Sequence, residues 1–293
     1  MDVTQRAESE QAALWRGRSG RAWVEAQAPL DQMFKPFEDL LAKAVCAGAG
    51  HRVLDVGCGT GSTTLAVARR LGAKGRCIGA DISDPMIAAA RARAEREDIT
   101  ACFIRADVQD HAFEPASFDL IISRFGVMFF DNPVLAFKNL RRAARDGADL
   151  CFIAWRSAAE NPFMTTAERA AAALLPNMPA RRPGAPGQFS FAHGHWVSSV
   201  LEESGWAEID IRPLNVECTF PESELVGYLS RLGPVGLILQ EADEQTRAQV
   251  METVRAAFDP YVHGLEVRYT AACWMVSARA RPAPGTLKGA THV

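Results

Sequence analysis

The chain lacks an excess of charge of either sign. Its 293 residues hold 32 Lys and Arg against 35 Asp and Glu, a formal net charge of −3. Proteins whose main partner is nucleic acid or an anionic membrane surface usually carry a basic patch. The arginines that cluster here, such as Arg141, Arg142 and Arg145, stand at helical spacing beside acids, which is typical of a solvated helix face. Nucleic acid is therefore not the expected partner.

Long apolar runs and paired cysteines are also missing. No run approaches the roughly 18 apolar residues of a membrane span, and the first residues, MDVTQRAESEQ, lack the apolar segment of a signal peptide. The seven cysteines are scattered without a C-x-x-C pair, which argues against a zinc site or a disulfide framework. We expect reduced cysteines, no metal, no membrane association and a cytoplasmic location.

The central part of the chain alternates short apolar runs with helical patterns. This alternation predicts an α/β fold with a doubly wound, mostly parallel sheet over residues 50–156. The fourth apolar run, FDLIISR, is nearly continuous, as expected for a strand that is buried on both faces. The expected strands are 51–57, 76–81, 101–107, 118–124 and 148–155, with helices at about 63–72, 83–97 and 132–147 between them.

The two flanks have a different pattern from the centre. We expect a helical cap at 1–49, with Asp31 capping its second helix at about 31–47. After the core at 50–156, residues 157–280 should form lid insertions and the last strands of the same sheet, and 281–293 a disordered tail. The expected elements of this third part are helices at 162–175 and 194–204, a proline-rich loop PNMPARRPGAPGQ, a strand at 208–218, two helices within 222–258, and a strand at 266–279.

A glycine-rich turn, VLDVGCGTG, follows the first strand of the core. In open α/β sheets this turn is the default ligand site. Its glycines Gly57, Gly59 and Gly61 are spaced G-x-G-x-G, and Ser62 stands where a dinucleotide-binding loop has its third glycine. Asp55 precedes them, and a carboxylate there would repel a pyrophosphate but attract an ammonium group. The loop therefore favours a ligand with a positive end over NAD, although an oxidoreductase remains an alternative.

Acidic residues also end the next two strands. Asp81 closes RCIGAD, where a carboxylate can accept both hydroxyl hydrogens of a ribose, as it does in NAD sites too. Asp107 closes ACFIRAD and could accept from an adenine amino group while Val108 packs against the ring. Sites for an ammonium group, a ribose and an adenine together describe S-adenosylmethionine (SAM).

The motifs VLDVGCGTG, GADIS, RADV and FDLIISRFGVMFF resemble, in order and spacing, those of class I SAM-dependent methyltransferases, notably the small-molecule enzymes of ubiquinone and menaquinone biosynthesis. The resemblance implies a seven-stranded Rossmann-like sheet whose last strand is antiparallel, with SAM over the strand ends. It also implies that Ile82 and Val108 sandwich the adenine. The expected cofactor-binding residues are Trp23, Asp55, Gly57, Cys58, Gly59, Gly61, Asp81, Ile82, Met86, Asp107, Val108, Ser123 and Arg124.

The segment SRFGVMFF follows the fourth strand and should border the transferable methyl group. Arg124 could hold the SAM carboxylate or an acidic acceptor. Trp15 and Trp23 stand about two helical turns apart, so both could cover the cofactor, with Gln27 as a further polar contact. The expected acceptor pocket consists of Phe125, Met128, Phe129, Trp155, Asn161 and Phe163.

No residue stands out as a catalytic base, and the candidates are His111, His193, His195 and Tyr228. The N-P-P-Y motif of amino-group methylation is absent after the fourth strand, which reads SRFG. We therefore expect a methyltransferase that acts on a small acceptor at O, C, S or N, with a preference for an aromatic or apolar metabolite. The alternatives are a SAM-binding regulator or scaffold without turnover and a nucleic-acid methyltransferase. The sequence leaves monomer and homodimer open.

Overall fold

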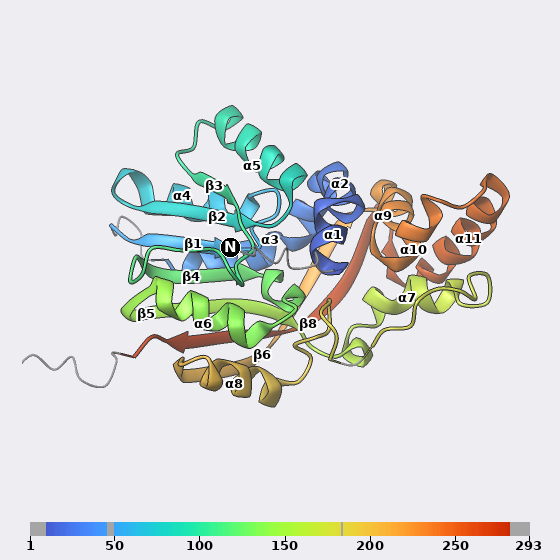
Figure 1. Ribbon diagram of the computed structural model, residues 1–293. Helices are drawn as coiled ribbons and strands as arrows, with labels where there is room; N and C mark the ends of the chain where they lie inside the picture. The colour runs from blue at the N-terminus through green and yellow to red at the C-terminus, as the bar shows by residue number, and fades with distance from the viewer. Residues whose placement is uncertain (1–9, 46–49, 183, 282–293) are drawn as a thin grey trace, which may run out of the picture.

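The protein is built around one mixed β-sheet (Figure 1). The structure, a computed structural model, describes residues 10–45, 50–182 and 184–281. The sheet strands are β1 (Arg52–Val56), β2 (Arg76–Asp81), β3 (Cys102–Arg105), β4 (Phe118–Arg124), β5 (Ala144–Trp155), β6 (Ala207–Pro221), β7 (Val262–His263) and β8 (Glu266–Arg279).

The order of the strands is β3-β2-β1-β4-β5-β8-β6, and the two-residue β7 pairs with β8 outside this path. Strands β1 to β5 pair in parallel, whereas β8 pairs antiparallel with both β5 and β6. The last strand of the chain is therefore inserted antiparallel between two earlier ones. The predicted doubly wound sheet with an antiparallel last strand is confirmed.

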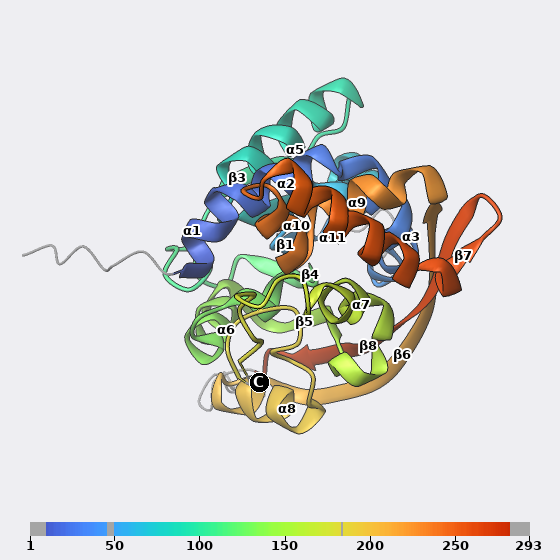
Figure 2. The same ribbon diagram turned by 90° about the vertical axis from the view of Figure 1, so that its right-hand side faces the viewer.

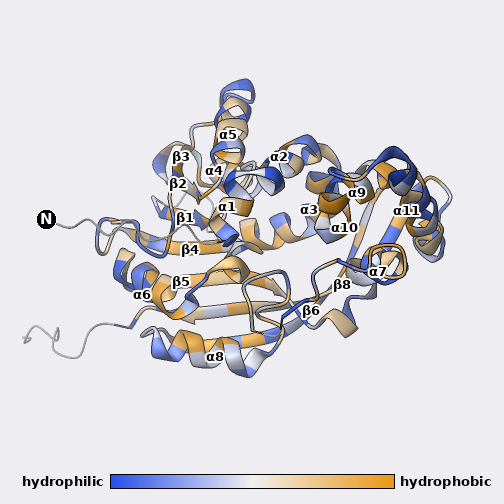
Figure 3. Cartoon of the chain, turned by 45° about the vertical axis from the view of Figure 1, so that its right-hand side comes forward, coloured by the Kyte–Doolittle hydropathy of each residue, from blue (hydrophilic) through white to orange (hydrophobic). Residues whose placement is uncertain are grey.

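Helices cover both faces of the sheet. Successive side chains of a strand point to opposite faces, and here the side chains on both faces are apolar, so both faces must be buried. In β4, Leu120 and Ile122 pack in one cluster with Val67 of α4, whereas Ile121 belongs to the main core with Phe137 of α6. Figure 3 shows β4 and β5 coloured as hydrophobic, and the outward surfaces of α5 and α11 as hydrophilic. The helices are α1 (Glu10–Arg16), α2 (Arg18–Glu25), α3 (Gln27–Lys43), α4 (Ser62–Leu71), α5 (Asp84–Arg96), α6 (Pro133–Ala143), α7 (Pro162–Ala171), α8 (Gly194–Glu203), α9 (Leu225–Arg231), α10 (Gly233–Leu239) and α11 (Glu244–Ala257).

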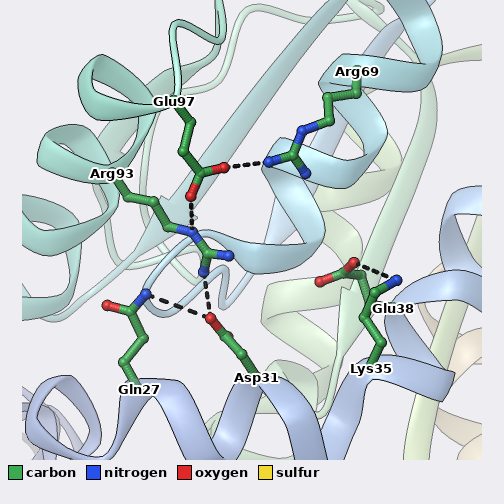
Figure 4. Close-up of polar contacts among 7 residues, drawn as sticks. All are labelled: Gln27, Asp31, Lys35, Glu38, Arg69, Arg93 and Glu97. Atoms are coloured by element: carbon green, nitrogen blue, oxygen red, sulfur yellow. Dashed lines mark hydrogen bonds and ion pairs between the residues drawn. The ribbon is translucent and has the colours of Figure 1, made fainter.

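The N-terminal helices differ from the prediction in where they start. Asp31 does not cap a helix, because α3 begins at Gln27 and Asp31 lies in its second turn. Its carboxylate instead accepts hydrogen bonds from Gln27 and, at 2.6 Å, from Arg93 of α5. Arg93 also binds Glu97 at 2.8 Å, and Glu97 pairs with Arg69 of α4 (Figure 4). This network fastens α3 to the core helices α4 and α5.

The C-terminal part extends the sheet and carries a lid. Strands β6 and β8 are 15 and 14 residues long, and they run beyond the other strands toward α9, α10 and α11 (Figure 1). We call α7, α9, α10 and α11 the lid helices; seen along this end in Figure 2, they lie in front of the sheet. The region has three helices where two were predicted, because Gly233, with φ +70°, breaks the chain between α9 and α10.

Several predictions concern features that the structure tests only in part. No helix among the described residues is long and apolar enough to cross a membrane. The six cysteines in the described part of the chain are free thiols, whereas Cys46 lies outside it. The predicted disordered tail also lies outside the described residues from position 282 onward. The cytoplasmic location and the boundaries at 49, 156 and 280 stay predictions.

Candidate functional site

A cavity lies at the carboxyl ends of β1, β2 and β4, where ligands bind in open α/β sheets. We call it the cofactor cavity. Seven of the cofactor residues proposed from the sequence line it together with Trp23 and Arg124. Its lining residues are Gln11, Ala12, Trp15, Trp23, Gly57, Gly59, Ala80, Asp81, Ile82, Met86, Ala106, Asp107, Val108, Gln109, Arg124, Phe125, Gly126, Phe129, Phe130 and Asp131.

The glycine loop forms the floor of the cofactor cavity because it has no side chains there. Gly57 has φ +66°, and a Cβ atom on it would lie 2.6 Å from the Cα of Gly126 in the next loop. Its N–H donates to the carbonyl of Ala80 at 2.8 Å, which fixes the loop against β2. Gly61 begins α4, and Cys58 is buried in the cluster behind the loop. Neither of these two residues lines the cavity, so their direct contact with a cofactor stays a prediction.

Asp81 lines the cofactor cavity at the end of β2. Its Oδ2 accepts the N–H of Gly59 at 2.8 Å, and its Oδ1 accepts the N–H of Ser83 at 2.9 Å. Burial raises the pKa of Asp81, and these backbone N–H groups partly offset that rise. Each oxygen keeps a further lone pair, because a carboxylate offers about four acceptor sites. The carboxylate is thus held rigidly while it can still accept two ligand hydroxyl groups.

Asp107 and its neighbours line the next part of the cofactor cavity. Its Oδ1 accepts from the backbone N–H of Gln109 at 3.0 Å. Gln109 lines the cavity too and was missed by the sequence reading, since a glutamine two residues past a strand carries no distinctive signal. Asn139 of α6 donates to the carbonyls of Val108 and His111 at 2.8 Å. The segment that would hold an adenine is therefore fixed from behind.

Asp55 does not line the cofactor cavity. It is 1% exposed and its Oδ2 accepts the hydroxyl of Thr64 at 2.6 Å. Burial raises its pKa to about 7, whereas Thr64 and the charge of Arg124 act in the opposite direction. Ser123 is likewise buried, and its hydroxyl donates to the carbonyl of Val56 at 2.7 Å. Direct contact of either residue with a cofactor stays a prediction, while their structural role is to fix the loop.

Arg124 is a cation in the wall of the cofactor cavity. Among the described residues it makes no hydrogen bond or ion pair, its Nη1 is buried, and its guanidinium lies 5.7 Å from the centre of the Phe34 ring. Burial lowers its pKa, and the acids Asp31 and Glu38 oppose that shift at longer range. A poorly solvated cation without a partner is costly. The site therefore favours a ligand with a negative group at this position.

A second cavity of about 300 Å³ lies between the N-terminal helices, β4, β5 and the lid helices. We call it the acceptor cavity. Most of its wall is aromatic or aliphatic, and it includes five of the six predicted acceptor residues. Its lining residues are Gln11, Leu14, Trp15, Ser19, Trp23, Leu30, Phe34, Phe125, Met128, Phe129, Trp155, Phe163, Met164, Ala167, Glu168, Arg181, Gly187, Gln188, Tyr228, Leu229, Leu232, Gly233, Pro234, Val235, Leu237 and Phe258.

The two cavities share five lining residues, Gln11, Trp15, Trp23, Phe125 and Phe129, which we call the collar. The ring of Trp15 meets those of Trp23 and Phe129 edge-to-face, with centroids 5.8 and 4.9 Å apart. Phe125 has φ +67°, a left-handed conformation that is uncommon for a bulky residue and often marks a functional site. The two cavities therefore adjoin at the collar, which consists of four aromatic side chains and one amide.

The remaining predicted polar residues lie elsewhere. Asn161 is buried and pairs with the backbone of Ala272 in both directions, at 2.8 and 2.9 Å, so it has a structural role and lines neither cavity. His193 and His195 stack on each other at the start of α8, outside both cavities, and His111 packs on Phe113. Gln27 bonds to Asp31 on the surface of α3. Of the four candidate bases, Tyr228 alone lines the acceptor cavity.

In comparisons with known proteins, residues 53–147 match the family described as a methyltransferase domain. The chain is 28% identical over 273 residues to the nocamycin O-methyltransferase of Saccharothrix syringae. This alignment covers 87% of this chain and 94% of that protein. It is 31% identical over 106 residues to a ubiquinone/menaquinone biosynthesis C-methyltransferase of Idiomarina loihiensis, covering 35% of this chain and 42% of that one. The motif resemblance is thereby confirmed.

The fold is also shared with solved structures. The YcgJ protein of Bacillus subtilis superposes with a TM-score of 0.56 at 15% identity, over 85% of this chain and all of that one. At this identity the similarity concerns the fold alone. It confirms the Rossmann-like architecture and leaves the ligands of this chain to its own residues.

Proposed function

We propose that this chain, whose residues 53–147 belong to the methyltransferase domain family, transfers a methyl group from SAM to a small acceptor bound in the acceptor cavity. The observation that carries the proposal is the aromatic collar shared by the two cavities. A cofactor cavity and an acceptor cavity with a common wall allow the acceptor atom to approach the methyl group while water is kept out.

The residues of the cofactor cavity fit SAM in its several parts. Asp81 would accept the ribose hydroxyl groups, and Asp107 the adenine amino group, with Ile82, Met86 and Val108 against the ring. Arg124, which lacks a hydrogen-bonding partner among the described residues, would pair with the methionine carboxylate. The glycine loop, at Gly57 and Gly59, has no side chains, so the methionine part of SAM could lie close to the protein backbone.

The protein's contribution to the reaction is alignment and desolvation. SAM supplies an activated methyl group on a sulfonium. The aromatic faces of Trp15, Trp23 and Phe129 favour a cation near the collar. The acceptor cavity orients an apolar body through contacts with Phe34, Trp155 and other rings, so we expect an aromatic or otherwise apolar acceptor.

The test is methyl transfer itself. The purified chain is incubated with SAM labelled in its methyl group and with extracts of apolar metabolites, and labelled products and S-adenosylhomocysteine are measured by mass spectrometry. A labelled product formed in step with S-adenosylhomocysteine supports the proposal. If SAM binds but no extract or model acceptor yields product, the alternative of a SAM-binding regulator without turnover gains, since the cofactor cavity would be the same in both.

A further inference from the structure

The point of methyl transfer is poor in groups that can take up a proton. The collar consists of four aromatic residues and Gln11, none of which titrates in the physiological range. Among all described residues that line the acceptor cavity, only Glu168, Arg181 and Tyr228 carry ionisable side chains. Three carboxylates line the cofactor cavity: Asp81 and Asp107 accept hydrogen bonds from backbone N–H groups, and Asp131 is exposed to solvent. None of the three lines the acceptor cavity.

The three ionisable groups of the acceptor cavity are each unsuited to act as a base. Glu168 is held by Arg181 in a bidentate pair, with Arg181 Nε donating to Oε2 at 2.9 Å. The hydroxyl of Tyr228 lies 3.9 Å from the sulfur of Met164, and burial raises the pKa of this phenol, which keeps it protonated. Among the described residues that line the acceptor cavity, an acceptor that must lose a proton would therefore find no free side chain to receive it.

The apolar wall also selects among acceptors that need no base. When an anion attacks a sulfonium, both charges disappear, and a medium of low dielectric favours that outcome. When a neutral amine attacks, a cation remains on the product. Glu168 is the one carboxylate among the described residues that line the acceptor cavity, and it is already engaged by Arg181, so it is not free to pair with that cation. The cavity therefore suits the neutral product of an anionic acceptor better than the cationic product of an amine.

Resting on the proposed function, we propose that the acceptor is an apolar compound with an acidic oxygen, a carboxylic acid or a strongly acidic enol, that arrives ionised. An oxygen lone pair forms the new bond to the methyl carbon, and the carbon–sulfur bond breaks with its electron pair going to sulfur. The products are a neutral methyl ester or enol ether and a neutral thioether. No proton moves within the protein, which explains why none of the histidines predicted as bases lies in either cavity.

The experiment compares three probes with one apolar body: naphthoic acid, naphthylmethanol and naphthylmethylamine. Each is titrated by calorimetry into the full chain saturated with sinefungin, which carries an ammonium group in place of the methylsulfonium, or with S-adenosylhomocysteine, whose sulfur is neutral. We expect naphthoate to bind the sinefungin complex at least about tenfold more tightly than the S-adenosylhomocysteine complex. Naphthylmethanol should show no preference, and naphthylmethylamine should prefer the S-adenosylhomocysteine complex.

Three variants test how charges in the acceptor cavity change the affinity for naphthoate. Glu168→Gln removes a like charge and frees Arg181, so naphthoate should bind several-fold more tightly, whereas Arg181→Gln should weaken it. Arg182→Gln is the matched control, because Arg182 is exposed and lines neither cavity. Tighter binding of the amine than of the acid, no preference of the acid between the complexes, or no binding of the acid would overturn the proposal. Failure of sinefungin and S-adenosylhomocysteine themselves to bind would overturn the proposed function instead, and this inference with it.

A turnover experiment distinguishes a carboxylic acid acceptor from an enol acceptor. With SAM, methyl naphthoate as product indicates a carboxylic acid acceptor, and the enol ether of 4-hydroxycoumarin, an enol about as acidic as a carboxylic acid, indicates an enol. Either product supports the shared chemistry of an ionised oxygen. Faster methylation of naphthylmethylamine than of both acids would contradict it.

Discussion

The cofactor cavity and the acceptor cavity are built in opposite ways. The cofactor cavity uses backbone groups and carboxylates at the ends of neighbouring strands, such as Asp81 and Asp107, which short motifs encode. The acceptor cavity joins side chains from α1, α2, α3, α7, α9 and α10, which are distant in sequence. The difference shows why the class of reaction can be read from local motifs, whereas the acceptor depends on how distant helices meet.

The largest expected effect on SAM affinity is that of replacing Asp81, which lines the cofactor cavity but not the acceptor cavity. Asp81→Ala would remove the proposed acceptor for two ribose hydroxyl groups, and hydrogen bonds to a charged group contribute about 1.5–3 kcal/mol each, so SAM affinity should fall by at least about a hundredfold. Calorimetry measures the affinity and circular dichroism confirms folding. Asp84→Ala is the control, since Asp84 is exposed and pairs with Arg105 on the surface. Unchanged affinity in Asp81→Ala would refute this placement of the ribose.

A substitution in the acceptor cavity should lower the stability of the fold and leave SAM affinity unchanged. Phe163 is 2% exposed and stacks on Tyr269 with centroids 3.8 Å apart, so Phe163→Ala should lower the free energy of unfolding by about 3–5 kcal/mol. Because Phe163 does not line the cofactor cavity, SAM affinity measured well below the melting temperature should stay the same. A parallel loss of SAM affinity would mean that the two cavities are not independent.

Arg124 tests the fit of the amino-acid end of the cofactor. Arg124→Met should weaken SAM by roughly 2 kcal/mol, because the variant loses an ion pair with the methionine carboxylate. Decarboxylated SAM should bind wild type and variant equally well. Arg105→Met serves as control, since Arg105 is exposed. If the variant loses affinity for both cofactors to the same extent, Arg124 contacts another part of the ligand or acts through the fold.

The collar should produce a smaller and more selective effect. Phe129→Leu removes an aromatic face near the sulfonium, which is worth about 1 kcal/mol, so affinity for SAM should fall roughly fivefold while affinity for S-adenosylhomocysteine stays nearly constant. Phe113→Leu is the control, because Phe113 is buried but lines neither cavity. Equal losses for the two ligands would place the sulfonium away from Phe129.

Asp55 should affect the stability of the fold, and its effect should be visible through pH. Its pKa is raised to about 7 in the fold, and the unfolded carboxyl ionises near its ordinary value of about 4. The folded state thus binds more protons in this window, so its stability falls as the pH rises from about 4 to about 7, and Asp55→Asn should lack this fall. Melting temperatures across the window, for wild type and variant, provide the check. Parallel curves would show that Asp55 ionises normally.

The sequence predicted most of the fold and the part of the site that depends on strand ends. Asp81 ends β2, and Asp107 and Val108 follow β3 within three residues, so their positions at one edge of the sheet could be expected. The pattern around Asp55 shows a carboxylate near the loop but not its direction, and Thr64 of α4 holds it away from the cavity.

The acceptor side could not be predicted in the same way. Gln11 and Arg181 reach the acceptor cavity only because α1 and the proline-rich loop pack beside the lid, as shown by the hydrogen bond from Gln11 to the carbonyl of Pro186. No local spacing encodes such a contact. Asn161 illustrates the converse, since its place beyond the fifth strand suggested a pocket residue, whereas its amide satisfies the backbone of β8.

The most direct test of the account is a calorimetric titration of the purified chain with SAM, S-adenosylhomocysteine and NAD. We expect saturable binding of the first two at one site per chain, lost in Asp81→Ala, with no heat from NAD. Binding of NAD without SAM would contradict it, because Asp81 would then hold the ribose of a dinucleotide and the loop VLDVGCGTG a pyrophosphate.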